Sequence, residues 1–431
     1  MLYLEFTVRV QILQTLYTCN FRRVIGLGVV LMNKKYIKRI IGIILLAAVL
    51  VASFFPLQEY FSNRITHNQV RIKGFYLEKK NSLDVIVMGS SEVYYGYYAN
   101  ETYKNTKITS YPFAFEHNPV SLWKYELKEI LKNQKPKLLV IEANGAGYGN
   151  IPKAGRPKVK SDVKNNIKGK YKLYSQLPIS ILESSMPDSE NKRQMLRDLA
   201  FARKKRKLDR YVPFLKYHGQ FYDNMSCDLS DMEKRGYSPL KGVFSRVSAH
   251  KQHKEKILPP NIKPGLLDPL AIRHLKKFIK LAKRMGVKKI LFVRFPHKVT
   301  DKKGVDKVRK YLRVKKIIEA AGCDYADFTF LRDEIGISSK RDFVDREHLN
   351  ANGARKFTAF LSKYIKAKYK LKATKLSVDE KKRWDEGVKY IDAYYKYYND
   401  YQRKYDFLRI LHKTFPESTS LLDTLKEYMK K

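Results

Sequence analysis

The sequence predicts an α/β fold in which a parallel sheet lies between two layers of helices. Candidate strands fall at 84–88, 109–115, 137–142, 287–295 and 323–328, and those at 84–88, 137–142 and 287–295 are short apolar runs with the length and branched composition of buried strands. Helices are expected between them, the clearest being the amphipathic segment 269–285, which Gly286 ends. Strands that alternate with helices in this order form parallel sheets with crossover helices.

A long apolar run at 40–57 predicts a membrane helix ahead of this domain. It is close to the minimum length that spans a bilayer. Four cations precede it directly (Lys34, Lys35, Lys38 and Arg39), and positive flanks stay cytoplasmic. We therefore expect a retained single-pass anchor at 32–60 with the rest of the chain outside the cytoplasm. The alternative is a signal peptide cleaved near 51–53. Met32 resembles a natural start, so residues 1–31 are treated as a possible upstream extension.

The composition restricts the classes of protein to consider. The chain has 431 residues and a net charge of +45, with 87 Lys and Arg against 42 Asp and Glu. A basic insertion is expected at about 150–264 within the main domain at 61–374, and it contains the run 203–207. No nucleic-acid fold motif accompanies that run, so we expect no nucleic-acid partner. Outside the membrane, the insertion is either a solvated, partly helical surface or a contact for anionic headgroups or a phosphate-bearing polymer.

The cysteines and the histidine pair of this sequence do not predict a metal site, and a capping box predicts a C-terminal helix. Three cysteines (Cys19, Cys227 and Cys323) do not make a disulfide framework. The pair His250-x-x-His253 lacks local cysteine or carboxylate partners, so no metal site and no cofactor are expected. A capping box at 377–380 opens a helical C-terminal extension at 375–431.

Ser91 is the candidate nucleophile. It follows the strand 84–88 and the turn at Gly89, and ligands bind outside the carboxyl ends of strands in open α/β sheets. A serine hydroxyl needs a base to take its proton. His348 is the candidate base, because Asp345 precedes it by three residues and can hold the ring in the tautomer that accepts a proton.

Three further residues are candidates for contact with the oxyanion or the substrate. Asn144 follows the strand 137–142 and could donate to an oxyanion, although Asn-Gly at 144–145 is equally typical of a simple turn. Gly89 and Ser90 directly precede the nucleophile. The tyrosines at 94, 95, 97 and 98 could pack on a sugar or acyl group, but such residues are more often packed in the core.

Gly89-Ser90-Ser91 after a strand, with Asp345-x-x-His348 near the end of the domain, resembles the SGNH (GDSL-type) hydrolase superfamily. The pattern is similar to membrane-anchored SGNH-like proteins of Gram-positive surface-polysaccharide loci, and Glu92 adds a likeness to the D-alanyl transfer protein of teichoic acid. The resemblance implies an SGNH or flavodoxin-like fold, with Ser91 as nucleophile, His348 as base and Asp345 as its partner. It departs from the family in having Ser90 before the nucleophile and no Gly-x-Asn-Asp block.

The resemblance implies an extracytoplasmic serine esterase or O-acyltransferase of the cell membrane. Its substrate would be an acylated cell-surface glycan or teichoic acid, and polysaccharide-assembly membrane proteins are possible partners. Two alternatives stay open. One is a non-catalytic scaffold that binds anionic wall polymer, and the other is D-alanyl transfer to teichoic acid.

Overall fold

The structure is a computed structural model that describes residues 34–62, 67–147, 176–200, 236–243, 255–256, 258 and 261–401. The chain divides into two compact units, and the first contains the N-terminal helix α2 (Lys34–Ser62). Within α2, Tyr36–Phe54 is 19 residues long with a mean hydropathy of 2.3, which is long and apolar enough to cross a membrane. The expected apolar helix is therefore present, and its topology stays a prediction.

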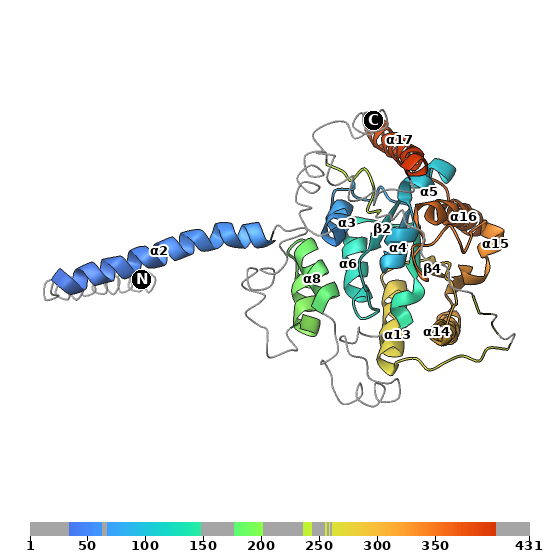
Figure 1. The fold of residues 1–431 in the computed structure, drawn as a ribbon, viewed down its shortest axis with the longest axis horizontal. Coiled ribbons are helices and arrows are strands. Elements are labelled where there is room, and N and C mark those ends of the chain that lie inside the picture. Colours follow the sequence, from blue (N-terminus) through green and yellow to red (C-terminus); the bar gives the residue numbers. More distant parts are fainter. Residues whose placement is uncertain are drawn as a thin grey trace, which may run out of the picture. The chain divides into compact units, whose positions relative to one another are not determined.

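The second unit contains a five-stranded parallel sheet (Figure 1). The strands are β1 (Val85–Gly89), β2 (Ser110–Ala114), β3 (Leu138–Glu142), β4 (Ile290–Arg294) and β5 (Asp324–Asp327). Their order across the sheet is β2-β1-β3-β4-β5, and every neighbouring pair is parallel. This is a doubly wound order, so the α/β class expected from the alternation of elements is confirmed.

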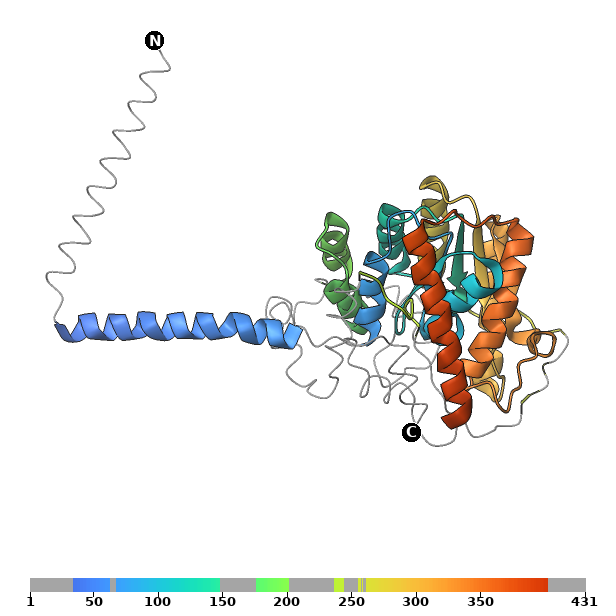
Figure 2. The ribbon, with the colours of Figure 1, turned by 90° about the horizontal axis from the view of Figure 1, so that it is seen from above.

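Helices cover both faces of the sheet (Figures 1 and 2). Successive strand residues point to opposite faces, and here both faces are apolar. Ile86, Met88 and Ile141 belong to one core cluster, while Val85, Val87 and Val140 belong to the other. The first cluster packs against α3 (His67–Tyr76), α6 (Trp123–Asn133), α13 (Pro269–Arg284) and α14 (Lys302–Ala320). The second packs against α4 (Ser91–Gly96) and α16 (Ala351–Tyr369).

Two helix boundaries show how local sequence fixes the elements. Asp268 caps α13 by accepting from the Leu270 backbone N–H, and Gly286 follows the helix at φ +83°, a conformation that favours glycine. Pro119 is typical of a first helical residue, yet helix α6 begins at Trp123. Pro119 starts a turn, in which its carbonyl accepts from the Leu122 N–H at 3.0 Å, and the helix follows that turn.

The described part of the second unit also contains several shorter elements. They are α5 (Ala99–Thr106), η1 (Ala143–Gly147), α8 (Gln176–Ser185), α9 (Glu190–Met195), η2 (Leu196–Ala200), η3 (Phe328–Phe330) and α15 (Arg332–Ile335). Only parts of the segment expected to form a basic insertion are described. The stretch 176–200 contains α8, α9 and η2 with a non-helical break at 186–189, and Leu182 and Met195 are buried against the core. The run 203–207 and the pair His250-x-x-His253 lie outside the described residues.

The helix α17 (Val378–Tyr401) begins at the predicted capping box. Ser377 Oγ accepts from the Glu380 N–H at 3.3 Å, and Glu380 Oε2 accepts from the Ser377 N–H at 2.9 Å. The helix packs on the α/β domain, since Trp384 is buried and its ring stacks on Tyr103 with centroids 5.0 Å apart. The rest of the expected extension, from residue 402, is outside the described residues.

Candidate functional site

The candidate site lies at the carboxyl ends of the parallel strands. From β1 the chain crosses to β2 on one side, and it then returns to β3 on the other side of β1. This reversal leaves a switch point between β1 and β3, which is where ligands bind in doubly wound sheets. Ser91 follows β1 and Asn144 follows β3, so the topology brings both to that point.

Gly89 places the nucleophile segment close to β3. A Cβ atom built on Gly89 would lie 2.6 Å from Glu142 Cβ and 2.5 Å from Val93 Cγ2. Only a glycine allows this approach without movement of the neighbouring chain. Ser91 is then the first residue of α4, and it is half-buried rather than fully enclosed.

His348 lies in a short hairpin that the sequence holds in place locally. Phe343 and Leu349 form an antiparallel bridge, and the Val344 N–H donates to the His348 carbonyl at 2.9 Å. Asp345 Oδ1 accepts from the backbone N–H groups of Glu347 and His348, at 2.7 and 2.9 Å. Short acidic side chains stabilise turns in this way, and the three-residue spacing puts the carboxylate beside the imidazole.

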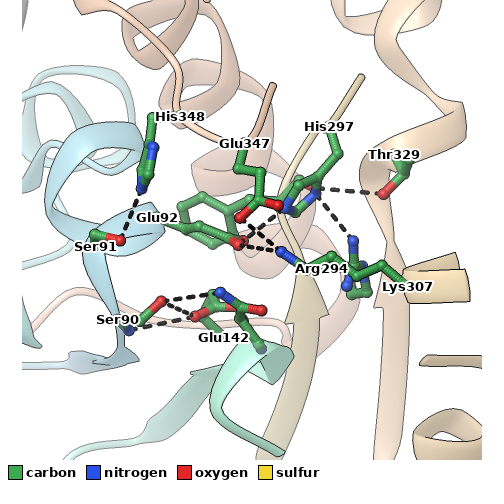
Figure 3. Close-up of polar contacts among 12 residues, drawn as sticks. Ser90, Ser91, Glu92, Glu142, Arg294, His297, Lys307, Thr329, Glu347 and His348 are labelled. Atoms are coloured by element: carbon green, nitrogen blue, oxygen red, sulfur yellow. Dashed lines mark hydrogen bonds and ion pairs between the residues drawn. The ribbon is translucent and has the colours of Figure 1, made fainter. Parts of the chain in front are cut away.

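Ser91, His348 and Asp345 form a continuous hydrogen-bonded chain. Ser91 Oγ is 2.7 Å from His348 Nε2, and His348 Nδ1 is 2.7 Å from Asp345 Oδ2 (Figure 3 shows the first contact). The ring of Tyr95 packs against the imidazole, with centroids 4.9 Å apart. The structure therefore brings together three residues that the sequence predicted to act together, across 257 positions between Ser91 and His348.

The electrostatics of the His348–Asp345 pair favour a charged carboxylate. Burial would lower the pKa of His348, but the hydrogen bond and charge of Asp345 outweigh it and raise the pKa above its usual value. Burial likewise opposes ionisation of Asp345, yet its bonds to His348 and to two backbone N–H groups hold its pKa well below the usual range. An imidazolium formed by accepting a proton would therefore be stabilised.

A second group of contacts lies beneath the nucleophile and involves Ser90 and Asn144. The buried Ser90 hydroxyl donates to Glu142 Oε2 at 2.8 Å, and the Ser90 N–H donates to the same oxygen at 3.3 Å. Burial, together with the nearby charge of Glu92, raises the pKa of Glu142 well above its usual value. Asn144 Oδ1 accepts from the Tyr311 hydroxyl at 2.6 Å, and Asn144 Nδ2 is 3.5 Å from Ser90 Oγ.

The three residues predicted to contact an oxyanion or the substrate are all hydrogen-bonded to neighbouring groups. The amide group of Asn144 is oriented by Tyr311, with its donor nitrogen directed toward the end of β1. The Gly89 carbonyl accepts from Asn118 Nδ2 at 3.1 Å. The roles of Asn144, Ser90 and Gly89 in binding an oxyanion or a substrate stay predictions.

Sequence reasoning missed a group of charged residues beside the catalytic candidates (Figure 3). Glu92 is buried, and its Oε1 accepts from His297 Nε2 at 2.9 Å and lies 3.7 Å from Lys307 Nζ. Burial would raise the pKa of Glu92, but His297 and Lys307 lower it to about 2. Arg294, at the end of β4, reaches His297 Nδ1 at 3.2 Å. Two signals could have revealed the group, namely the position of Glu92 after Ser91 and the polar residues at the end of β4.

The arrangement is chemically suited to proton transfer from a serine. Ser91 Oγ is within hydrogen-bonding reach of a nitrogen that can accept its proton, and the other ring nitrogen is fixed by a carboxylate. Tyr94, Tyr95, Tyr97 and Tyr98 are buried, so the interpretation that they pack in the core is the one the structure supports. Among the described residues, no group of three His, Cys, Asp or Glu could hold a metal ion.

Comparisons with known proteins do not assign a family. No family model matches the chain, and no curated protein or solved structure shows significant similarity to it. The class that the described residues define is therefore a doubly wound α/β domain with a Ser-His-Asp arrangement at its switch point.

Proposed function

We propose that this protein is a membrane-anchored, extracytoplasmic serine esterase or O-acyltransferase of the SGNH type. The observation that carries the proposal is the hydrogen-bonded chain from Ser91 through His348 to Asp345, with both distances at 2.7 Å. Its position at the carboxyl ends of β1 and β3 adds support, since function in such sheets is concentrated there. The apolar helix Tyr36–Phe54, preceded by cations, supports the anchored topology.

The proposed reaction proceeds through an acyl-serine. Ser91 Oγ attacks the ester carbonyl carbon while His348 Nε2 accepts the hydroxyl proton. The tetrahedral intermediate collapses, the ester C–O bond breaks, and His348 returns the proton to the leaving alcohol. Water or an acceptor hydroxyl then attacks the acyl-serine, with its proton passing to His348 and from there to Ser91. Asn144 Nδ2 is the candidate side-chain donor to the oxyanion.

The substrate class follows from the compartment and the charge. The whole chain has a net charge of +45, and most of its residues follow the apolar helix. A basic enzyme outside the membrane is suited to an acylated surface polysaccharide, including an anionic one such as teichoic acid. Hydrolysis and transfer use the same residues. They differ only in whether water or a sugar hydroxyl reaches the acyl-serine, so the proposal covers both reactions.

A fluorophosphonate probe tests the nucleophile directly. The detergent-solubilised full chain should be labelled, and peptide mapping should place the adduct on Ser91. Ser91→Ala and His348→Ala should abolish labelling, whereas Ser90→Ala should retain an adduct on Ser91. Release of acetate from acetylated wall glycan, with Ser91→Ala as control, then tests the substrate class. A wild-type protein that is inert to the probe while its fold is intact would refute the enzymatic proposal.

One observation favours a second candidate, a non-catalytic protein that binds anionic polymer. Helix α13 carries six Arg and Lys residues and no Asp or Glu (Arg273, Lys276, Lys277, Lys280, Lys283 and Arg284). A surface of this kind attracts polyanions through a salt-dependent interaction. The two functions separate experimentally, because a binding protein would retain polymer in the Ser91→Ala variant and would show no probe labelling.

A further inference from the structure

Three charged residues connect the nucleophile segment to the base segment. Lys307 projects from α14, and its Nζ is 2.8 Å from Glu347 Oε2 and 3.7 Å from Glu92 Oε1 (Figure 3). Glu92 directly follows Ser91, and Glu347 directly precedes His348. We call Glu92, Lys307 and Glu347 the carboxylate bridge. A single ammonium group thus contacts the chain neighbours of both members of the Ser91–His348 pair.

The side chains of the carboxylate bridge are partly or fully shielded from solvent and are held by further contacts. The side chain of Glu92 is only 1% exposed and that of Lys307 is 22% exposed, so solvent screens their interaction less than it screens a surface pair. Glu92 is also held by His297, at 2.9 Å. Burial would raise the pKa of Glu347, but Lys307 outweighs it and lowers that pKa. Both carboxylates are therefore charged at neutral pH, and Lys307 is attracted to each.

We propose that Lys307 is a positioning residue that ties the turn carrying Ser91 to the hairpin carrying His348. This inference rests on the proposed serine chemistry, and it assigns a role to a residue that does not touch the reacting atoms. A nucleophile and a base on separate segments lose rate steeply when their geometry loosens. The bridge restrains the two segments directly beside the reacting pair, in addition to the packing of α4 on α16.

The bridge also sets the charge around His348. The titratable or charged groups that contact the imidazole, or that act on the carboxylates around it, come from its own hairpin, from α4, from the segment after β4 and from α14. They are Asp345 and Glu347, Glu92 and Tyr95, His297 and Lys298, and Lys307. Glu92 and Glu347 both act to raise the pKa of His348. Lys307 contacts both carboxylates, and a nearby cation acts in the opposite direction on the pKa of an imidazole. Removing Lys307 should therefore raise the pKa of His348, and removing the charge of Glu347 should lower it.

The test uses four variants of the full chain. Lys307→Met removes the ammonium and keeps most of the stem, Lys307→Arg restores a cation, and Glu347→Gln removes one carboxylate. Lys315→Met is the matched control, because Lys315 lies on the same helix and its ion pair within the described part of the chain is with the exposed Glu319, at 3.8 Å. The fold should survive Lys307→Met, since His297 continues to hold Glu92 and Glu347 is partly exposed.

Two readouts are measured for each variant. The first is the second-order rate of fluorophosphonate labelling, and Lys307→Met should slow it about tenfold while Lys307→Arg recovers most of the loss. The second is the pKa of His348 from its NMR titration, assigned with the His348→Gln variant. It should rise by about half a pH unit in Lys307→Met and fall by a similar amount in Glu347→Gln. Lys315→Met should change neither quantity.

The two readouts distinguish failure of this inference from failure of the proposed function. If the wild type is not labelled but the His348 pKa shifts in opposite directions in the two variants, the serine chemistry is wrong and the coupling through Lys307 stands. If the wild type is labelled and Lys307→Met matches Lys315→Met in both rate and pKa, Lys307 has no positioning role. A pKa that moves in the same direction in Lys307→Met and Glu347→Gln would also overturn the inference.

Discussion

Replacing Asp345 with Asn changes the charge beside His348 while keeping the shape of the side chain. The Asn oxygen can still accept from the backbone N–H groups of Glu347 and His348, which Asp345 Oδ1 bonds at 2.7 and 2.9 Å. The hairpin should therefore keep its fold, with a loss of about 1 kcal/mol in unfolding free energy. The bond from His348 Nδ1 to Oδ2 is the one that changes, because an amide nitrogen would face the ring nitrogen.

The size of the effect on rate follows from that bond. A hydrogen bond to a charged group contributes about 1.5–3 kcal/mol, and each 1.36 kcal/mol corresponds to a tenfold change in rate. Loss of this hydrogen bond alone should reduce the labelling rate roughly 10- to 150-fold. An Asn side chain also stabilises the tautomer of His348 that cannot accept the serine proton, which can bring the total loss of rate to about 10⁴-fold. The Asp345 side chain is 41% exposed, so solvent screening places the expected loss nearer 10²- to 10³-fold.

The assay is the second-order rate of fluorophosphonate labelling, with circular dichroism and urea unfolding as measures of the fold. Asp333→Asn is the matched control, because Asp333 is an exposed acid on α15 and is not among the charges that shift the pKa of His348. It should label at the wild-type rate. An Asp345→Asn protein that folds normally and labels within about twofold of wild type would refute the role of Asp345.

Three further outcomes are expected. Asp345 raises the pKa of His348, and the neutral imidazole is the form that accepts a proton. The labelling rate should therefore increase with pH, with its midpoint above the ordinary histidine pKa of about 6.5. A midpoint below about pH 6 would contradict the stabilisation of the imidazolium by Asp345. Gly89→Ala should lower the unfolding free energy by about 1–3 kcal/mol in urea, because the added Cβ would overlap Glu142 and Val93. Gly304→Ala, whose added Cβ has its nearest contact at 3.3 Å, should lower the unfolding free energy less. Equal losses of unfolding free energy in the two variants would count against a close approach at Gly89. Trp384→Ala should lower the unfolding free energy by about 3–5 kcal/mol, because the indole ring is buried against Tyr103. An unchanged melting temperature in this variant would mean that α17 does not stabilise the domain.

The sequence was sufficient for the strands and for the local parts of the site. Runs such as Val85–Gly89 and Leu138–Glu142 are apolar on both faces, and that property is visible without coordinates. Asp345 and His348 are three residues apart in one hairpin, so their contact is local and could be predicted from spacing. The capping box at Ser377 and Glu380 is local in the same way, and it was confirmed.

Helix starts that depend on tertiary contacts were less predictable. Pro119 is typical of a first helical residue, but the segment after it is fixed by a bond from the Val120 N–H to the Gly145 carbonyl, at 3.1 Å. That contact joins the segment before α6 to η1 and favours a turn before the helix begins at Trp123. Propensity alone contains no information about such a partner.

The sequence by itself was enough to predict an apolar N-terminal helix and a parallel α/β domain, and to select one serine and one histidine as candidates for proton transfer. Only the tertiary structure decided that Ser91 Oγ and His348 Nε2 are 2.7 Å apart, and that Glu92, His297 and Lys307 meet beside them. The physical reason is that these residues come from separate segments, namely the turn after β1, the segment after β4, helix α14 and the hairpin that carries His348. The order of strands in the sheet sets which of these segments are neighbours. Local periodicity does not encode that order, whereas the packing of helices on both faces of the sheet fixes it.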